Sequence, residues 1–357
     1  MKVLHISRTM GQGGAEKIVL QLCAAAGSVE HAVISCGGSC EEALQEMGVP
    51  HFWMPDIDRK NPATMWKCFV AILKVVKQEK IHILHSHHRM AAFYARIVSL
   101  LLPCKCVYTA HNVFYGKKTL FRFAVSGAKI VAVGKGVKEN LVREYGQKEE
   151  DILVIPNAIN KTCVYTEDPF LTGLRKDGNR LFGSIGRITR QKGVDVFIKA
   201  VAQVIKKHPW CAGIIVGDGE ERKKMEQLVD TLQLRDHIFF LGYQPNVLSI
   251  IRQLDAVVLA SRWEGLPLTP IEAFSQGKAV IASDISGNNE LVEDGFNGFL
   301  FPMDDDSKLA EKMLAFLDDK CSREEMEKNA LDTYEARFSY EAFLAAYRWV
   351  YDSVFEK

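Results

Sequence analysis

Two carboxylates, Glu264 and Glu272, stand eight positions apart in the stretch EGLPLTPIEA, directly after a predicted strand, DAVVLAS (255–261). The strand places Glu264 at its carboxyl end, the edge at which parallel α/β sheets bind ligands. Thr269 and Pro270 match an N-cap followed by proline at the first helical position, with Glu272 completing a capping box, so we expect a helix to begin near residue 270. A capping box explains Glu272 but leaves Glu264 unexplained. Acids on a loop and on a first helical turn could bind two hydroxylated parts of one ligand.

Two cations follow another predicted strand, in LFGSIGRITRQKG (181–193). Arg187 comes directly after the strand, and Lys192 precedes the predicted helix VDVFIKAVAQVI. Gly186 lets the backbone bend and approach a ligand closely. Guanidinium and ammonium groups beside a helix start form a cradle for a diphosphate, in which each charge-assisted contact contributes roughly 1.5–3 kcal/mol. Exposed cations without a ligand are the alternative interpretation.

Gly217 and Tyr243 follow two further predicted strands, in VGDGEE (216–221) and LGYQPNV (241–247). A glycine permits close approach of a ligand, and an aromatic ring offers a flat apolar face. These two positions could therefore receive a nucleobase.

Histidines mark strand ends in the amino-terminal half of the chain. His111 follows the predicted strand CVYTA, while His85, His87 and His88 cluster at the end of HILHS, directly before Arg89. Neutral imidazoles bind metals, but no cysteine or carboxylate is near this cluster in the sequence, so a metal site is the less favoured hypothesis. We expect His111 to lie at the ligand. We expect His85, His87 and Arg89 to contact a second ligand or to bond to a neighbouring loop.

Asp56 and Asp58 have the Asp-x-Asp spacing with which some sites bridge a diphosphate through a divalent metal. They follow a doubtful short strand, HFWM (51–54), and precede Asn61 and Pro62, which match a helix cap and first turn. The cations described above already provide positive charge. We therefore interpret these residues as loop acids and expect no metal and no cofactor.

The elements that position these residues alternate between strands and helices along the chain. Short apolar runs such as KVLHIS, HAVISC and KIVAV alternate with segments of helical periodicity, which predicts parallel sheets covered by helices. The alternation lapses for about twenty residues after PNAIN (156–160), and we interpret this segment as a linker. We expect an α/β fold of two doubly wound domains, residues 1–160 and 161–339, with an amphipathic last helix at 340–357 packing back on the first. The crevice between two such domains is the expected ligand site.

The composition is that of a globular protein of about two domains. The 357 residues are 48% hydrophobic and 25% charged, and no apolar run approaches the roughly 18 residues of a membrane-spanning helix. The chain meets Arg8 and a glycine cluster before any apolar segment of signal-peptide length. Nine cysteines without the spacing of a zinc site indicate reduced thiols in a cytoplasmic protein.

The net charge of +1 hides an uneven distribution, because residues 1–160 have a formal charge of +7 and the remainder −6. Residues 80–138 contain ten lysines and arginines and no acid, and FYGKKTLFRF (114–123) mixes cations with aromatic side chains. Such a surface suits an anionic membrane or a phosphate-bearing ligand. A solvated basic face without a partner is the alternative, and nucleic acid is not an expected partner.

The order of these motifs resembles a known family. R-x4-K-G, VGDG, LG-Y, S-x2-EG-x-P-L-x3-EA, ASD and DG-x-x-G-F-L follow one another over residues 181–301, and GGAEK, H-x-H, T-A-H and IPNAI precede them. Together they look like the retaining family 4 glycosyltransferases (glycosyl transferases group 1) of the GT-B fold. The resemblance spans nearly the whole chain, with IPNAI standing where the family usually has PNGI.

The resemblance implies two Rossmann-like domains that face each other across a cleft. It implies transfer of a hexosyl or N-acetylhexosaminyl group from a nucleotide-diphosphate sugar to a hydroxyl acceptor, with retention of configuration by front-face attack. Arg187 and Lys192 would hold the diphosphate, Glu272 would bind the ribose hydroxyls, and Glu264 would contact the transferred sugar. His111 would lie near the sugar and the acceptor.

The resemblance also assigns backbone roles. The N–H groups around Leu268 and Thr269 would bind phosphates, and Gly13 and Gly14 would close over the donor. UDP is the favoured nucleotide because it is the commonest among similar proteins. The basic amino-terminal half favours a lipid-linked or polysaccharide-precursor acceptor, and peripheral attachment to the inner face of the cytoplasmic membrane stays open.

Three other functions stay open at this point. A nicotinamide-dependent dehydrogenase would need a third glycine where Glu16 stands, and an acid after the second strand, where the sequence has Cys36-Gly37-Gly38. A sugar-nucleotide epimerase of similar architecture would have no acceptor groove, which the basic segment 80–138 disfavours. A non-catalytic nucleotide-sugar-binding subunit is disfavoured by the intact set of acids, cations and His111.

Overall fold

The computed structural model describes residues 1–25, 27, 29–162 and 164–356. The chain forms two compact units. The first unit runs from Met1 to Asn157 and includes the segment from Tyr340 onward, and the second unit runs from Ala158 to Ser339. The division thus falls after Asn157, where the sequence pattern predicts it after residue 160.

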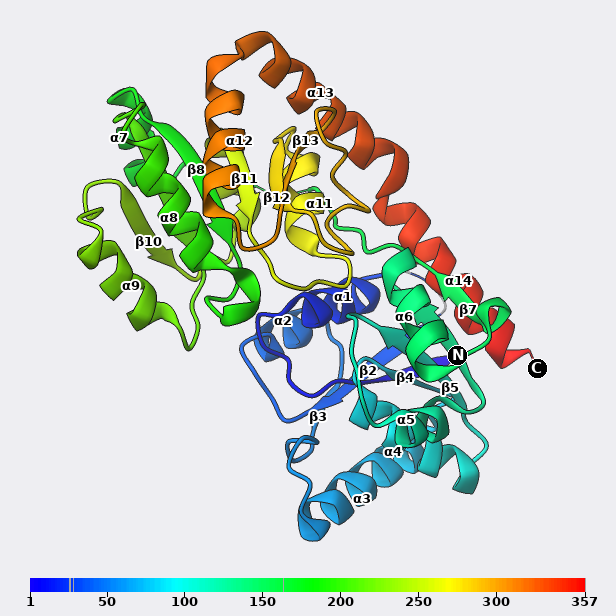
Figure 1. The fold of residues 1–357 in the computed structure, drawn as a ribbon. Helices are drawn as coiled ribbons and strands as arrows, with labels where there is room; N and C mark the ends of the chain where they lie inside the picture. The colour runs from blue at the N-terminus through cyan, green and yellow to red at the C-terminus, as the bar shows by residue number, and fades with distance from the viewer. Residues whose placement is uncertain (26, 28, 163, 357) are drawn as a thin grey trace. The chain divides into compact units, whose positions relative to one another are not determined.

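The first unit contains a seven-stranded sheet in the order β3-β2-β1-β4-β5-β6-β7 (Figure 1). All of its pairings are parallel, and its strands are β1 (Lys2–Ile6), β2 (Glu30–Ser35), β3 (His51–Trp53), β4 (Ile83–Ser86), β5 (Lys105–Ala110), β6 (Ala128–Ala132) and β7 (Ile152–Val154). The winding reverses at β1, which lies between β2 and β4. Ligands of open α/β sheets bind at such a reversal, beyond the carboxyl ends of the strands. The register of β1 and β4 sets His5 opposite His85.

Helices connect these strands and pack against the sheet (Figure 1). They are α1 (Gly14–Cys23), α2 (Glu41–Glu46), α3 (Pro62–Glu79), α4 (Arg89–Leu101), α5 (Lys118–Val125) and α6 (Lys135–Tyr145), followed by the 3-10 turn η1 (Glu149–Asp151). The cap predicted for α3 is present, since Asn61 accepts a hydrogen bond from the Thr64 N–H at 2.8 Å and Pro62 occupies the first turn. The short strand HFW, which the sequence pattern leaves doubtful, forms β3.

The last helix, α14 (Tyr340–Phe355), belongs to the first unit and packs against β5. Its Tyr351 hydroxyl is hydrogen-bonded to His85 Nδ1 at 2.8 Å, and its Tyr347 hydroxyl to Thr109 Oγ1 at 3.1 Å. All four side chains are buried, so the bonds satisfy polar groups that have no access to water. Lys357, the last position of the predicted helix, lies outside the described residues.

The second unit contains a six-stranded parallel sheet in the order β10-β9-β8-β11-β12-β13. Its strands are β8 (Arg180–Ile185), β9 (Cys211–Val216), β10 (Ile238–Gly242), β11 (Ala256–Leu259), β12 (Val280–Ser283) and β13 (Gly298–Phe301). Its helices are α7 (Pro169–Lys176), α8 (Val194–Val204), α9 (Arg222–Thr231), α10 (Val247–Gln253), α11 (Leu268–Ser275), α12 (Asp306–Asp318) and α13 (Lys320–Arg337), with a 3-10 turn η2 (Arg190–Lys192) before α8. The winding reverses at β8, between β9 and β11.

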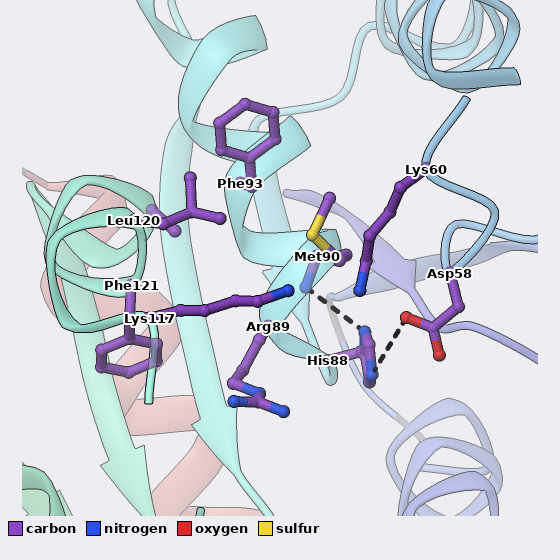
Figure 2. Close-up of a pocket in the computed structure, with 10 residues that line it drawn as sticks. Asp58, Lys60, His88, Arg89, Met90, Phe93, Lys117, Leu120 and Phe121 are labelled. Atoms are coloured by element: carbon purple, nitrogen blue, oxygen red, sulfur yellow. Dashed lines mark hydrogen bonds and ion pairs between the residues drawn. The ribbon is translucent and has the colours of Figure 1, made fainter. Parts of the chain in front are cut away.

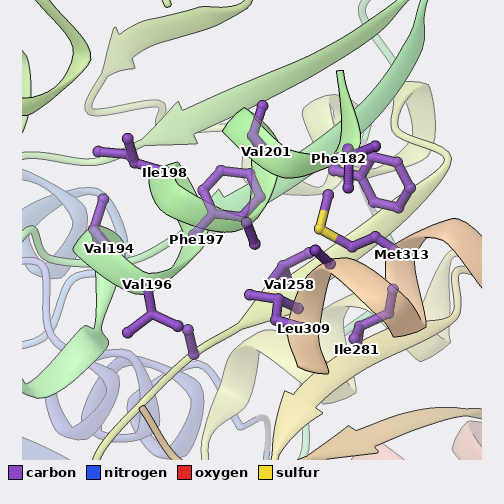
Figure 3. Close-up of a cluster of buried hydrophobic side chains, with 14 of the residues drawn as sticks. Phe182, Val194, Val196, Phe197, Ile198, Val201, Val258, Ile281, Leu309 and Met313 are labelled. Atoms are coloured by element: carbon purple, nitrogen blue, oxygen red, sulfur yellow. The ribbon is translucent and has the colours of Figure 1, made fainter. Parts of the chain in front are cut away.

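The core of the second unit fixes one side of this sheet against two helices (Figure 3). Apolar side chains of α8 and α12, among them Phe197 and Leu309, pack on Val258 of β11 and Ile281 of β12. These side chains have no solvent-exposed surface. A rigid core of this kind holds the loops at the carboxyl edge in defined positions.

The predicted linker after residue 160 is partly wrong, because the structure has helix α7 there. Asp168 caps the helix by accepting hydrogen bonds from the N–H groups of Phe170 at 2.9 Å and Leu171 at 3.1 Å, and Pro169 occupies the first turn. Arg175 of this helix donates a hydrogen bond to the Gln253 carbonyl at 2.7 Å, which ties α7 to the end of α10 within the second unit.

None of the helices in the described residues combines the length and apolar character that a crossing of a lipid bilayer requires. Eight of the nine cysteines are free thiols, and the ninth, Cys163, lies outside the described residues.

Candidate active site

In the second unit, two of the predicted site residues contact each other directly. Lys192 Nζ lies 2.6 Å from Glu264 Oε1, in an ion pair whose side chains are 20% and 7% exposed. Lys192 ends the turn η2 after β8, and Glu264 stands on the loop after β11, so the pair joins the carboxyl ends of two adjacent strands. Ser261 Oγ also donates to Glu264 Oε1, at 2.7 Å. The carboxylate is thus fixed by two donors before any ligand is bound.

A close approach of two backbone segments places these residues side by side. Gly193 has φ +62, and a Cβ at this position would lie 2.0 Å from the Ala260 carbonyl oxygen. Only glycine therefore fits between the turn η2 and the end of β11. Gln191 adds a second tie, since its side-chain N–H donates to the Trp263 carbonyl at 2.8 Å.

The capping box predicted around Thr269 is wrong. The helix α11 begins at Leu268, its N-cap is Pro267, and no side chain caps it. Thr269 instead lies within the first turn, and its hydroxyl donates to the Ile185 carbonyl at 3.4 Å, which ties α11 to the end of β8. Glu272 is 5% exposed and lies one turn into the helix. Without a capping residue, the N–H groups at the start of α11 are suited to bind phosphate oxygens.

Arg187 and Tyr243 lie at the same carboxyl edge of the second sheet, on exposed surface. The Arg187 guanidinium has no hydrogen bond or ion pair with any residue that the structure describes. Gly217 has φ +128, and a Cβ there would lie 2.0 Å from the Gly186 carbonyl oxygen, so the ends of β8 and β9 approach each other closely. The sequence-predicted donor residues of this half therefore follow β8, β9, β10 and β11 along one sheet edge.

Arg262, which also follows β11, has a structural role. Its guanidinium donates to Asp195 at 2.9 Å, to Asp304 at 2.7 Å and to the Arg190 carbonyl at 2.7 Å. These bonds connect the loop before Glu264 to the turn η2 and to α8. Arg262 is thus held by these bonds, whereas the exposed Arg187 remains available to a ligand.

In the first unit, four imidazoles form a continuous chain of hydrogen bonds. His31 Nδ1 lies 2.9 Å from His5 Nε2, His5 Nδ1 lies 3.0 Å from His87 Nε2, and His87 Nδ1 lies 3.0 Å from His111 Nε2. The chain crosses β2, β1 and β4 and ends after β5, at the carboxyl edge of the sheet. Each neutral ring has a single N–H, so donation by one ring sets which nitrogen of the next ring can donate. The tautomer of His111 is therefore coupled to that of His31.

Burial keeps this chain uncharged at neutral pH. It lowers the pKa of His111 and the pKa of His31 to about 4 each. The pKa values of His5, His85 and His87 are lowered well below the ordinary value for the same reason, and neighbouring imidazoles add to the effect. His111 is thus suited to hydrogen-bond a substrate as a neutral ring, and not to act as a cation.

The prediction that His85 contacts a second ligand is wrong. Its ring is fully buried, and both nitrogens are bonded within the unit, to the Tyr351 hydroxyl and to Thr109 Oγ1, each at 2.8 Å. His87 is 6% exposed and has both nitrogens bonded to other histidines, so it acts on a ligand only through His111. Arg89, at the start of α4, lies at the edge as expected, with its guanidinium 4.6 Å above the Phe114 ring.

The glycine loop and the two loop acids occupy the remainder of this edge. Gly13 is the N-cap of α1 and Gly14 its first residue, at the end of the loop that follows β1. Asp56 forms a two-fold bond with Arg8, with both distances 3.0 Å, and Asp58 lies 3.1 Å from the same guanidinium. This arginine hydrogen bond lowers the pKa of Asp56. Both acids thus already have a cationic partner.

Two groups of the described residues have the spacing to hold a metal ion: His5 with His85 and His87, and His5 with Cys23 and His31. The first group contains His85 and His87 of the predicted histidine cluster and no cysteine or carboxylate, whereas the second contains Cys23 but no histidine of that cluster. In both groups, however, the imidazole nitrogens already hydrogen-bond to one another or to side-chain hydroxyls. His5 and His31 are the members that sequence reasoning missed, because their strands give no local signal that the rings align.

Taken together, the two parallel sheets and their glycine-rich edges define a two-domain α/β protein of the GT-B fold. The model of the family "Glycosyl transferases group 1" matches residues 170–333, and that of "Glycosyltransferase Family 4" matches residues 12–162. The chain belongs to this family of glycosyltransferases.

Curated relatives have the same class of activity. The chain is 29% identical to an Escherichia coli protein named UDP-Gal:alpha-D-GlcNAc-diphosphoundecaprenol alpha-1,3-galactosyltransferase. The 278 aligned residues cover 71% of each of the two chains. It is 25% identical over 297 residues to N-acetyl-alpha-D-glucosaminyl L-malate synthase of Bacillus anthracis, covering 79% of this chain and 77% of the relative.

Among solved structures, the chain is similar to HepE of Anabaena in complex with UDP-glucose. The TM-score is 0.87 at 22% identity, with 99% of this chain and 100% of the other covered. Sucrose-phosphate synthase of Thermosynechococcus elongatus gives a TM-score of 0.83 at 18% identity, with 99% of each chain covered. These likenesses show the fold.

Proposed function

We propose that the protein transfers a sugar from a nucleotide-diphosphate sugar, with UDP favoured, to a hydroxyl group of a lipid-linked or polysaccharide-precursor acceptor. The observation that supports this most is the Lys192–Glu264 ion pair, held at the carboxyl edge of the second sheet beside the uncapped start of α11. At this edge a cation and the N–H groups of a helix start can bind the phosphates of a sugar diphosphate, and a carboxylate can accept hydrogen bonds from its sugar. The names of the UDP-glucose-bound neighbour and of the UDP-galactose-using relative agree with this donor class.

In this proposal, the donor phosphates replace part of the contact between Lys192 and Glu264. Arg187 and Lys192 bind the diphosphate and stabilise the negative charge that grows on it as the bond to the sugar breaks. Glu264 then accepts hydrogen bonds from the transferred sugar, and Glu272 accepts hydrogen bonds from the ribose hydroxyls. The N–H groups of Leu268 and Thr269 donate to phosphate oxygens, and Gly186, Gly217 and Tyr243 border the nucleotide.

Retention by front-face attack is part of the proposal. The acceptor oxygen forms its bond to the anomeric carbon on the face that the diphosphate leaves, and the hydroxyl proton moves to a departing phosphate oxygen. His111 contributes as a neutral hydrogen-bonding group near the sugar, because its low pKa leaves it uncharged. Gly13 and Gly14, in the loop after β1, contact the donor through their backbone.

We propose that the reaction needs no divalent metal and no other cofactor. Arg187 and Lys192 provide the positive charge that a metal would supply to the diphosphate. Asp56 and Asp58, the residues with the spacing of a metal-binding string, are paired with Arg8. Free thiols throughout the described cysteines support a reducing, cytoplasmic location, and the basic segment 80–138 favours peripheral attachment to the membrane.

The test is a melting-temperature series with UDP, GDP and ADP and their common sugars, each in EDTA and in Mn²⁺. Ligand at one hundred times its dissociation constant adds about 2.7 kcal/mol to the free energy of unfolding. We expect one nucleotide family to raise the melting temperature equally under both conditions, and the matching sugar nucleotide to be consumed when a hydroxyl acceptor is added. Stabilisation that depends on Mn²⁺ would sink the metal-free part, and no response to any nucleotide would sink the donor assignment.

A further inference from the structure

A cavity of about 360 Å³ lies in the first unit at the carboxyl edge of its sheet (Figure 2). Its lining comes from three loops and helix starts: Asp58 and Lys60 after β3, His88 and Arg89 after β4, and Lys117 after β5. The volume falls in the range of small-ligand sites, roughly 300–1,000 Å³. The donor roles proposed above use none of these residues.

The polar side of this cavity has an excess of positive charge. Lys60, Arg89 and Lys117 line it, and Asp58 is its one acid. That carboxylate is already paired, 3.1 Å from the Arg8 guanidinium and 3.9 Å from His88 Nε2. Among the described residues, the three cations of the lining therefore form no ion pair with a carboxylate of the cavity.

Two of these cations converge from distant parts of the chain. Figure 2 shows the Lys60 and Lys117 side chains extending into the cavity from opposite sides, near the start of α4. The neighbouring Lys60 ammonium lowers the pKa of Lys117 by direct contact and by repulsion. Lys117 also has a left-handed backbone with φ 54, which is unfavourable for a residue other than glycine. Two ammonium groups that share one space repel each other, and an anion between them would replace this repulsion with attraction.

The remainder of the cavity lining is apolar. It comes from Met90 and Phe93 of α4 and from Leu120, Phe121 and Ala124 of α5. Leu120 is 40% exposed, and it continues the apolar wall out to the surface of α5. A small hydrophilic anion would gain nothing from this wall, whereas a hydrocarbon chain attached to the anion would be removed from water by it.

We propose that this cavity binds the acceptor of the reaction through a phosphate or diphosphate group linked to a hydrocarbon chain. The anion lies between Lys60, Lys117 and Arg89, and the hydrocarbon follows Phe93 and Leu120 toward the surface. The inference rests on the proposed function for the sugar that such a lipid would present, but the recognition of the head and chain is independent of it. The bound molecule is a single amphiphile and not the membrane surface as a whole.

Binding of farnesyl diphosphate by calorimetry, without any nucleotide sugar, tests the proposal. Farnesol has the chain without the anion, and inorganic diphosphate has the anion without the chain. We expect the amphiphile to bind, and each of the two partial probes to bind at least about tenfold more weakly. Lys60→Gln and Lys117→Gln each remove one charge-assisted contact and weaken the binding of the amphiphile by about tenfold to a hundredfold.

Lys118→Gln is the matched control, because Lys118 adjoins Lys117, is exposed and pairs with Glu144 outside the cavity. The control should bind farnesyl diphosphate within twofold of the unmodified protein. An equal loss in Lys118→Gln would indicate a diffuse basic surface and overturn the proposal. Inorganic diphosphate that binds as tightly as the amphiphile would overturn it too, since the apolar wall would then have no role.

Sedimentation with anionic and neutral vesicles separates a lipid ligand from a membrane surface. We expect Lys117→Gln to lose the amphiphile while it keeps most of its binding to anionic vesicles. Loss of both in parallel would assign the cavity to general membrane attachment and contradict the proposal. UDP-induced stabilisation, measured on the same samples, keeps the two failures apart: a donor failure leaves farnesyl diphosphate binding intact, and a failure of this cavity leaves the UDP response intact.

Discussion

The carboxyl edges of the two sheets differ in how they hold their polar groups. At the edge of the second unit, the groups are charged and fixed by short ties, as in the Lys192–Glu264 pair and the Arg262 bonds to Asp195 and Asp304. At the edge of the first unit, a chain of neutral imidazoles reaches the surface at His111. The same doubly wound architecture thus holds fixed ion pairs at one edge, and at the other it places a chain of uncharged imidazoles beside the Arg8–Asp56 pair and the cationic cavity.

This difference has a physical reason. A diphosphate has the same charge and spacing in every donor, so preorganised cations can bind it without rearrangement at the moment of reaction. Hydroxyl groups of a sugar both donate and accept, and a neutral imidazole can match either role by changing its tautomer. Each of the following experiments disturbs one edge and should leave the other unchanged.

The largest expected effect is a selective loss of stability of the first unit in acid. Folding keeps His31 and His111 neutral with pKa values of about 4, whereas the unfolded chain binds protons below the ordinary value near 6.5. The unfolded state therefore takes up more protons between these values, and stability that is complete above pH 6.5 is lost as the pH falls toward 4. From pH 7.5 to 5, we expect a loss of about 2 kcal/mol for each of these two rings, with a further loss from the more deeply buried three.

Urea unfolding of protein labelled with fluorotryptophan measures this effect unit by unit. Trp53, Trp66 and Trp349 report on the first unit, and Trp210 and Trp263 report on the second. The midpoint of the first set should fall steeply toward pH 5 while that of the second set changes little. Equal shifts of the two sets would contradict the comparison.

The next largest effect should follow from Glu264→Gln. The substitution keeps the shape of the side chain but removes the charge that pairs with Lys192 and that would bind the sugar. We expect the turnover number for sugar transfer to fall by about a hundredfold to a thousandfold, as when a preorganised polar group is removed from an active site. Stabilisation by the nucleotide should persist, because Arg187 and Lys192 still bind the diphosphate. Unchanged turnover would exclude Glu264 from the site.

A smaller effect, on the order of 2 kcal/mol in the free energy of unfolding, is expected for Gly193→Ala. The new Cβ would lie 2.0 Å from the Ala260 carbonyl oxygen, so the turn bearing Lys192 must move away from the loop bearing Glu264. Gly146→Ala is the matched control: its φ is 59, close to that of Gly193, but no atom lies within 4 Å of the added Cβ. The control should lose only the backbone contribution of about 1 kcal/mol and keep full activity. Equal losses in the two variants would show that the close approach does not position the pair.

The sequence predicts the residues of the second edge better than it predicts their contacts or the imidazole chain of the first edge. Strand ends, glycines and their following acids and cations are local signals, so Arg187, Lys192, Glu264 and Tyr243 could be assigned to one sheet edge. Their mutual contacts could not, because the Lys192–Glu264 pair depends on the adjacency of β8 and β11, which are separated by 70 residues or more.

A local pattern is misleading where tertiary structure competes with it. Thr269 fits a capping box, yet the helix starts two residues before the predicted position 270, and the Thr269 hydroxyl donates to the Ile185 carbonyl at the end of β8. The imidazole chain gives no local sequence signal for a related reason. His5 and His31 are ordinary residues of apolar strands until the register of β1 with β2 and β4 aligns their rings.

The smallest effect, and the most specific to the first unit, is expected for His31→Phe. The variant keeps an aromatic ring on β2 but removes the nitrogen that is hydrogen-bonded to His5 Nε2, so the chain ends one ring earlier. Because each ring sets the tautomer of the next, the proportion of the two tautomers of His111 should change although the substituted residue does not contact it. Long-range proton–nitrogen NMR spectra of histidine-labelled protein measure that proportion directly.

We expect the turnover number of His31→Phe to fall by about tenfold or less, roughly the value of one neutral hydrogen bond, with the Michaelis constant for the donor unchanged. His82→Phe is the control, since the His82 ring accepts a hydrogen bond from the Lys2 N–H and lies outside the chain of imidazoles. If the His111 nitrogen signals are identical in all three proteins, the four rings are neighbours that satisfy one another's hydrogen bonds and do not transmit a proton position.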